Sequence, residues 1–238
     1  MILCNHEGGQ VMKLKDRINE FLREKQYTEE QILFMDSSSV YIAQQISFYA
    51  HRNQRRLNGD YYFKHPYNVM SLYRDFTGII EGDYFCVDID LLVGECNIPY
   101  DGVQEVCLLH DVLEDTDVTL EEIENVFDEL SLGEHFRRYI KIPLSLLTHD
   151  KSEDYVVYIS KLIEHPAAAL VKFMDMADNM NPSDLNKFGN AELERILKYA
   201  YYCKIINDRW LFLENICRYK KMFNESSAPS NNDSVGQN

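Results

Sequence analysis

Residues 107–117 read CLLHDVLEDTD, and this stretch decides how the rest of the chain is interpreted. Four ionisable side chains, those of His110, Asp111, Glu114 and Asp115, lie within a run of leucines and valines. Moving a charge out of water is costly unless the charge is paired or binds a metal ion. The stretch therefore predicts a helix that is buried on one side and carries a group of functional polar side chains on the other.

On an α-helix these four polar side chains share one sector. An advance of about 100° per residue spreads them over about 140° of the helix circumference. The sector contains no lysine or arginine, and three carboxylates at this spacing repel one another. A divalent cation would remove the repulsion, because imidazole and carboxylate groups suit transition metals and manganese. Taken alone, the stretch leaves two interpretations open, a metal site and an exposed acidic face.

The composition is that of a folded acidic protein. The chain has 238 residues, of which 45% are hydrophobic and 12% aromatic, enough to bury a core within a single domain. Its formal net charge is -15, so its surface repels nucleic acids and anionic membranes, and we predict neither as a partner. An acidic protein that handles an anionic substrate needs a bound cation or a local positive patch.

The sequence shows no signal for export or for a membrane. The six cysteines form no CxxC pair, which favours reduced thiols over a disulfide framework. The first residues lack the basic and apolar segments of a secretory signal, and there is no run of about 18 apolar residues that could span a bilayer. We therefore expect a cytoplasmic protein, whose oligomeric state stays open.

Apolar spacing and capping signals predict helices along most of the chain. The predicted helices are 11–25, 29–49 with a break near residue 36, one that starts at the His65-Pro66 pair, 105–115, 119 to about 130, 152–163, 167–180, and 191 to about 223 as one long helix or two short ones. Thr119 and Glu122 match a capping box, and proline suits a first helical turn. The predicted fold class is all-α.

These helices are expected to form one main domain. Residues 1–37 are predicted as an N-terminal helical extension, residues 38–224 as the domain itself, and the polar residues 225–238 as a disordered tail. Residues 77–104 are predicted to be an irregular, acidic insertion between helices, whose secondary structure the pattern does not settle.

Two further segments carry polar side chains that would complete a metal site. His65 follows a tyrosine-rich loop, DYYFKHP, and a lone histidine of this kind is more often a structural hydrogen-bonding residue. In LVKFMDMADNMN, residues 170–181, Asp175 and Asn179 are four residues apart and share a helix face. The alternative for Asp175 is an ordinary ion pair with Lys172.

Taken together, these segments resemble a known family. The order of an HP phrase, HDxxED and a KxxDxxxN helix is similar to the HD superfamily of metal-dependent phosphohydrolases, and more narrowly to the hydrolase domain of RelA/SpoT proteins and the stand-alone small alarmone hydrolases. The matching phrases are YAHRNQRRLNGDYYFKHPYNVM (49–70), LLHDVLEDTDVTLEEIENVF (108–127) and LVKFMDMADNM (170–180). The resemblance covers residues 38–205, and HDxxEDT is its most specific part.

The resemblance implies a metal site and a pair of catalytic carboxylates. The implied metal ligands are His65, His110, Asp111 and Asp175. Two nitrogens and two oxygens suit Mn²⁺, with iron, magnesium or zinc as alternatives. Glu114 and Asp115 would orient and deprotonate the attacking water or protonate the leaving oxygen, while the cation lowers the pKa of water and neutralises phosphate charge.

The resemblance also places nucleotide contacts on Arg56, Asn179 and Tyr199, and Lys64 is a further candidate because it would add positive charge beside Arg56. Each of the two basic residues is equally compatible with an ordinary surface position, and the tyrosine with a core position. The chain departs from the family pattern at Leu57, where a lysine usually follows the arginine, and at Tyr61, which replaces a proline. These departures weaken the assignment of the substrate more than that of the metal.

Three functions are therefore considered. The leading hypothesis is a metal-dependent pyrophosphohydrolase that removes the 3′-pyrophosphate from (p)ppGpp-type alarmones. The alternative is an HD phosphohydrolase that acts on another nucleotide, namely a nucleoside mono- or triphosphate or a cyclic signalling nucleotide. The third is a catalytically silent nucleotide sensor, which the complete set of ligands and carboxylates disfavours.

Overall fold

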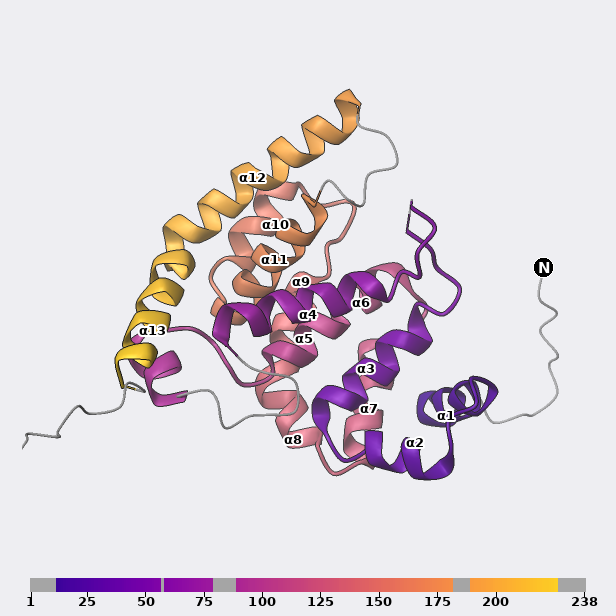
Figure 1. The fold of residues 1–238 in the computed structure, drawn as a ribbon. Helices are drawn as coiled ribbons and strands as arrows, with labels where there is room; N and C mark the ends of the chain where they lie inside the picture. Colours follow the sequence, from indigo (N-terminus) through magenta and orange to yellow (C-terminus); the bar gives the residue numbers. More distant parts are fainter. Residues whose placement is uncertain (1–11, 57, 79–88, 182–188, 227–238) are drawn as a thin grey trace, which may run out of the picture.

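The computed structural model describes residues 12–56, 58–78, 89–181 and 189–226, and most of these are helical (Figure 1). Within these ranges there is no β-strand, only an isolated antiparallel bridge between Arg55 and Tyr61. Every helix in this part of the chain is too short or too polar to cross a bilayer. The predicted all-α class is confirmed.

The α-helices are α1 (Leu14–Glu24), α2 (Glu29–Met35), α3 (Ser39–Ala50), α4 (Lys64–Thr77), α5 (Val103–Leu109), α6 (Val112–Asp115), α7 (Leu120–Glu129), α8 (Gly133–His135), α9 (Lys141–Leu147), α10 (Tyr155–Leu162), α11 (Pro166–Asn179), α12 (Asn190–Trp210) and α13 (Phe212–Ser226). In the part of the chain that the structure describes, two π-helical segments, Asp90–Glu95 and Phe136–Ile140, lie between them. The predicted break near residue 36 and the helix start at His65-Pro66 are confirmed. The capping box is also present, because Thr119 Oγ1 accepts from the Glu122 amide and Glu122 accepts from the Thr119 amide.

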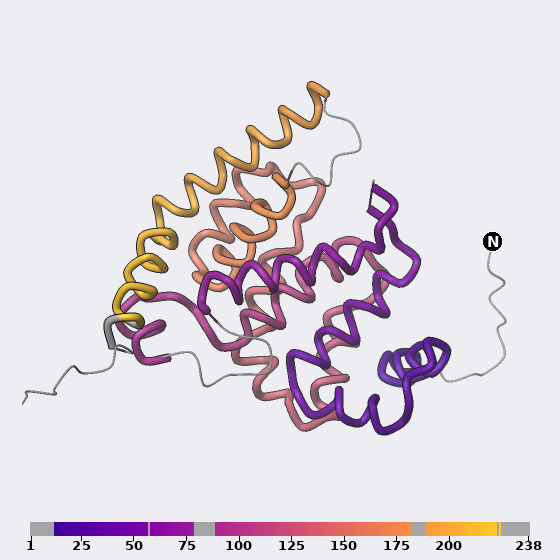
Figure 2. The backbone as a smooth tube through the Cα atoms, in the orientation of Figure 1, coloured from indigo at the N-terminus to yellow at the C-terminus, as the bar shows by residue number. Residues whose placement is uncertain are grey.

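Helix α5 lies at the centre of the molecule and is buried on every side. All seven of its residues are buried. It packs against α3, α4 and α11, and α12 lies along the outer face of α11 (Figures 1 and 2). Each apolar side chain buried there contributes about 1.5–3 kcal/mol to folding. The segments that precede and follow α5 are therefore held in fixed positions.

The predicted helix 105–115 is interrupted at its functional residues. Helix α5 ends at Leu109, and α6 begins only at Val112, with the HD pair between them. The imidazole Nδ1 of His110 lies 2.7 Å from the carbonyl oxygen of Cys107. A continuous helix would pair that carbonyl with the amide of Asp111, so the side chain competes with the helical hydrogen bond. The expectation of one continuous helix was wrong for this reason.

The described part of the segment between α4 and α5 is partly buried. Residues 79–88 lie outside the described part of the chain, whereas Asp90–Glu95 form a π-helical segment. Leu92, Cys96 and Ile98 are almost completely buried in the hydrophobic core. The described residues of the predicted insertion 77–104 thus contribute side chains to the core.

The C-terminal residues form two helices, the second of the two predicted arrangements. Leu211 adopts φ 54°, which ends α12, and α13 begins at the next residue. Helix α13 continues to Ser226, and the rest of the predicted disordered tail lies outside the described residues.

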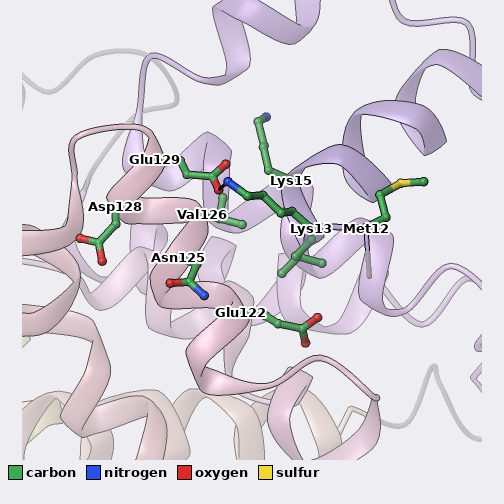
Figure 3. A pocket seen from close by; sticks show the side chains of 9 residues that line it. Met12, Lys13, Lys15, Glu122, Asn125, Val126, Asp128 and Glu129 are labelled. Carbon is green, nitrogen blue, oxygen red and sulfur yellow. Dashed lines mark hydrogen bonds and ion pairs between the residues drawn. The ribbon is translucent and has the colours of Figure 1, made fainter. Parts of the chain in front are cut away.

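The N-terminal helices share the core of the rest of the molecule. Leu14, Ile18 and Leu22 of α1 are buried in the same hydrophobic cluster as α5. Helix α1 packs on α7 beside a pocket of about 410 Å³, at which the ammonium of Lys13 lies 2.6 Å from a carboxylate oxygen of Glu129 (Figure 3). The predicted division of the chain after residue 37 stays a prediction.

Candidate metal centre and active site

Three helical segments bring the four implied metal ligands together. His65 comes from the first turn of α4, His110 and Asp111 from the junction of α5 and α6, and Asp175 from α11. One donor atom from each of His65, His110 and Asp111 lies within 4.8 Å of the other two. Segments more than 100 residues apart in the sequence thus converge on one point.

Asp175 completes this arrangement. Its Oδ1 lies 3.1 Å from Nε2 of His65 and 3.7 Å from Nε2 of His110. Asp111 faces the same two nitrogens, at 3.5 Å and 3.2 Å respectively. The four side chains therefore direct two imidazole nitrogens and two carboxylate groups toward a shared centre, and we call them the HD cluster.

Both imidazoles are oriented by a hydrogen bond at the nitrogen that points away from this centre. Nδ1 of His65 lies 2.6 Å from Oδ2 of Asp178, and Nδ1 of His110 donates to the Cys107 carbonyl. Nε2 of His110 is completely buried, and the carboxylates of Asp111 and Asp175 approach it at 3.2 Å and 3.7 Å without forming an aligned hydrogen bond. A buried polar atom without a partner is costly, and a divalent cation is a partner that suits the neighbouring nitrogens and oxygens. The HD cluster fits a divalent metal ion.

The carboxylates of the cluster favour protonated histidines when no cation is bound. Burial alone would lower the pKa of His65, but hydrogen bonds and charges from Asp175, Asp178 and Asp111 outweigh it and raise that pKa. The pKa of His110 lies well above its usual value because the carboxylates of Asp111 and Asp175 outweigh burial in the same way. Metal and protons therefore compete for the same nitrogens.

Asp175 is held by more than the two histidines. Oδ2 accepts from the ammonium of Lys172 at 2.8 Å, and Oδ1 accepts from the amide of Asn179 at 2.6 Å. The ion pair between Lys172 and Asp175, which the sequence suggested as an alternative, is present and uses Oδ2. The other oxygen, Oδ1, faces the two histidines of the HD cluster. The two interpretations of Asp175 are therefore compatible.

The two candidate catalytic carboxylates lie one turn beyond the cluster, on α6. Glu114 is half-buried, and its Oε2 accepts a long 3.4 Å hydrogen bond from the amide of His149. Asp115 is exposed, and its Oδ2 lies 3.2 Å from the hydroxyl of Tyr62. The polar sector thus passes from a buried histidine to an exposed aspartate.

Two residues that contact Asp111 and Asp115 were missed by sequence reasoning. The hydroxyl of Tyr62 lies 2.8 Å from Oδ2 of Asp111, and the amide of Gln54 donates to the backbone carbonyl of Asp115 at 2.6 Å. Both residues come from the loop between α3 and α4, which passes beside α6 (Figure 2). The sequence did contain a signal for Tyr62, which lies three residues before His65 and just ahead of the same helix. A side chain at this position can be expected close to the proposed metal ligand.

The four residues predicted to contact the substrate differ in their partners and in their exposure to solvent. Arg56 pairs with buried Asp178, its Nη1 lying 3.0 Å from Oδ2. Asn179 contacts Asp175 directly, whereas Lys64 is exposed and lies 2.7 Å from Asp60. Tyr199 is half-buried, and burial together with the charge of Asp175 raises its pKa. Leu57 lies outside the described residues.

The sequence of this chain was compared with protein-family models and with known proteins. No protein-family model matches the chain. Over 136 residues it is 29% identical to a probable guanosine-3′,5′-bis(diphosphate) 3′-pyrophosphohydrolase of Synechocystis sp., a match that covers 56% of this chain and 15% of the relative. Over 130 residues it is 29% identical to the guanosine-3′,5′-bis(diphosphate) 3′-pyrophosphohydrolase of Aquifex aeolicus, covering 55% of this chain and 16% of the relative. The chain is therefore similar in sequence to hydrolases of the RelA/SpoT type.

The similarity is confined to a part of these relatives. The chain spans about a sixth of the length of either curated relative. A solved structure of a metazoan ortholog of SpoT, described as hydrolysing ppGpp, is 26% identical, and its match covers 77% of this chain and 96% of that chain with a TM-score of 0.49. The predicted resemblance to RelA/SpoT hydrolases is confirmed by the sequence matches.

Proposed function

We propose that this protein is a metal-dependent pyrophosphohydrolase that removes the 3′-pyrophosphate from (p)ppGpp-type nucleotides. The observation that carries the proposal is the HD cluster, in which two imidazoles and two carboxylates converge and two further carboxylates follow one helical turn later. The names of the two curated relatives support the substrate class. An all-helical fold with a buried histidine-aspartate cluster is consistent with this chemistry.

We propose Mn²⁺ as the ion, held by the four residues of the HD cluster. A mixed set of two nitrogen and two oxygen donors suits manganese better than calcium, which prefers oxygen ligands alone. When bound, a divalent ion supplies Lewis acidity, which lowers the pKa of a nearby water molecule and neutralises phosphate charge. This would also explain how a protein with a net charge of -15 handles an anionic substrate.

Glu114 and Asp115 are proposed to move the protons of the reaction. A general base must lie within hydrogen-bond reach of the water that it deprotonates, and a general acid near the oxygen that leaves. Both carboxylates lie on α6, directly after the HD pair, and both are more exposed than the two histidines of the cluster. They are therefore accessible to a substrate whose phosphates approach from solvent.

The nucleotide is proposed to contact four side chains around the cluster: Arg56, Lys64, Asn179 and Tyr199. Asn179 lies within the contact network of Asp175 and would reach a sugar hydroxyl beside the reacting phosphate. Lys64 is exposed and would attract phosphate charge, and Tyr199 presents a half-buried ring for a base. Residues 38–224 are proposed to form this catalytic domain, which we place in the cytoplasm, with no nucleic acid or membrane as a partner.

The direct test is hydrolysis by the metal-loaded full chain. Protein stripped with chelator and reloaded with Mn²⁺ would be incubated with ppGpp, with deoxynucleoside triphosphates, with nucleoside monophosphates and with cyclic dinucleotides. Release of pyrophosphate from ppGpp, with little product from the others, is the expected result. Turnover of another nucleotide alone would favour the alternative phosphohydrolase, and tight binding without turnover would favour a silent sensor.

A further inference from the structure

The shortest contact of His65 is with a carboxylate outside the HD cluster. Nδ1 of His65 lies 2.6 Å from Oδ2 of Asp178, and both side chains are only 4% exposed. Its contacts with Asp175 and Asp111 through Nε2 are longer, at 3.1 Å and 3.5 Å. The two nitrogens of this ring thus have separate tasks, one toward the cluster and one toward Asp178.

The carboxylate of Asp178 is itself fixed by two other groups. Nη1 of Arg56 lies 3.0 Å from Oδ2, and the side-chain amide of Asn68 donates to Oδ1 at 3.1 Å. Arg56 lies in the loop before α4 and Asn68 lies on α4, whereas Asp178 itself lies on α11. A buried carboxylate with this many donors has a defined orientation, and the guanidinium balances its charge.

We propose that Asp178 is a positioning residue that fixes the tautomer and orientation of His65 for metal binding. A carboxylate only accepts hydrogen bonds, so the proton of the neutral imidazole must lie on Nδ1. The lone pair of Nε2 is then directed toward Asp175 and Asp111, and the negative charge behind the ring makes that nitrogen a stronger ligand. The inference rests on the metal site of the proposed function and extends it to a residue outside that site.

The two histidines of the HD cluster differ in the group that accepts the hydrogen bond from Nδ1. His110 donates from Nδ1 to the neutral backbone carbonyl of Cys107, whereas His65 donates to a charged group. Charge-assisted hydrogen bonds are about twice as strong as neutral ones. Because Arg56 balances Asp178, the protein gains this stronger hydrogen bond without adding net negative charge next to Asp111 and Asp175.

The test measures metal affinity rather than activity. Metal-free full-length protein would be titrated calorimetrically with Mn²⁺, as wild type and as Asp178→Asn and Asp178→Ala. We expect Kd to rise about 10-fold for the asparagine, which still accepts from Nδ1, and about 100-fold for the alanine. Asp208→Asn is the matched control, since Asp208 also pairs with a basic residue on a helix but is exposed, and its Kd should equal that of wild type.

A spectroscopic measurement on the wild type covers the case in which the variants do not fold. In the protein loaded with diamagnetic Zn²⁺, long-range ¹H–¹⁵N correlation should show His65 with a proton on Nδ1. An unprotonated Nδ1 would overturn the inference, as would a Kd within about threefold of wild type for both folded Asp178 variants.

Failure of the proposed function is distinguishable from failure of this inference. If Asp178 variants lose Mn²⁺ affinity but the wild type does not hydrolyse ppGpp, the positioning role stands and the proposed substrate fails. If the wild type binds neither Mn²⁺ nor Zn²⁺, both are overturned.

Discussion

The hydroxyl of Tyr62 lies 2.8 Å from Oδ2 of Asp111, a proposed metal ligand, and 3.2 Å from Oδ2 of Asp115, a proposed catalytic carboxylate. A single phenol thus connects the metal centre with the proton-transfer residues one helical turn away. Because both acceptors are carboxylates, the phenol must act as the donor, and its single O–H is shared between them, with the shorter contact to Asp111. Tyr62 is therefore expected to hold the two side chains at a fixed separation.

Replacing Tyr62 by phenylalanine should weaken the site while leaving the fold intact. We expect Mn²⁺ affinity to fall about 10-fold, as is typical when a partner of a metal ligand is removed, with a loss of about 1 kcal/mol in stability. Calorimetric titration and thermal melting measure these two quantities. Tyr61→Phe is a matched control, because Tyr61 is the exposed neighbour whose ring stacks on Arg55; an equal effect of both substitutions would refute the role of Tyr62.

Glu114→Gln and Asp115→Asn should separate metal binding from turnover. Loss of a general acid or base typically reduces kcat by about 10²- to 10⁴-fold. Neither change replaces a residue of the HD cluster, and an asparagine at position 115 can still accept from Tyr62, so the Kd for Mn²⁺ should stay within about threefold of wild type. Single-turnover pyrophosphate release and metal titration on the same preparations give both values. Undiminished release in both variants would remove these carboxylates from the mechanism.

Local signals in the sequence predicted most of the helices. The capping box at Thr119 and the proline after His65 act over three or four residues, so their effect on the backbone can be predicted without knowledge of the tertiary structure. The break between α5 and α6 could not be predicted in the same way. It depends on the rotamer of His110, which brings Nδ1 to the Cys107 carbonyl, and that rotamer is set by the packing around α5.

The four proposed metal ligands could be selected from sequence because a motif resembled a known family, whereas their supporting residues could not. Tyr62 contacts Asp111 across 49 residues and Asp178 contacts His65 across 113 residues. Contacts of this range depend on how α4, α5 and α11 pack. A weaker signal was present for Asp178, since residues three and four apart share a helix face, and Asp178 lies three residues after Asp175.

Metal binding should stabilise the folded protein. In the metal-free protein the four buried or half-buried ligands repel one another or compete for protons, and one divalent ion would satisfy all four. Because the unfolded chain does not bring these ligands together, the ion binds mainly to the folded state and stabilises it. At a free Mn²⁺ concentration of about 100 times Kd, the gain should be about 2.7 kcal/mol. Differential scanning calorimetry with and without chelator measures it, and His110→Ala should abolish the difference. An unchanged melting temperature in wild type would argue against a metal site.

The contact between His135 and Glu105, which lies outside the HD cluster, should make stability depend on pH. Nε2 of His135 lies 3.1 Å from Oε1 of buried Glu105, which also accepts from Ser39 at 2.5 Å. The hydrogen bond that His135 donates to Glu105 raises the pKa of His135 above 6.5 despite partial burial, and the charges of Glu105 and Asp101 act in the same direction. The folded state therefore holds this proton at pH values at which the unfolded chain has released it.

The stabilisation from this contact should thus be fully present below pH 6.5 and be lost as pH rises through the raised pKa of His135. His135→Gln keeps a donor for Glu105 but cannot titrate, so it is the control. The free energy of unfolding would be measured by urea denaturation for both proteins between about pH 5 and 9. We expect wild type to lose stability relative to the glutamine variant across this range, and a difference that is constant with pH would contradict the predicted linkage.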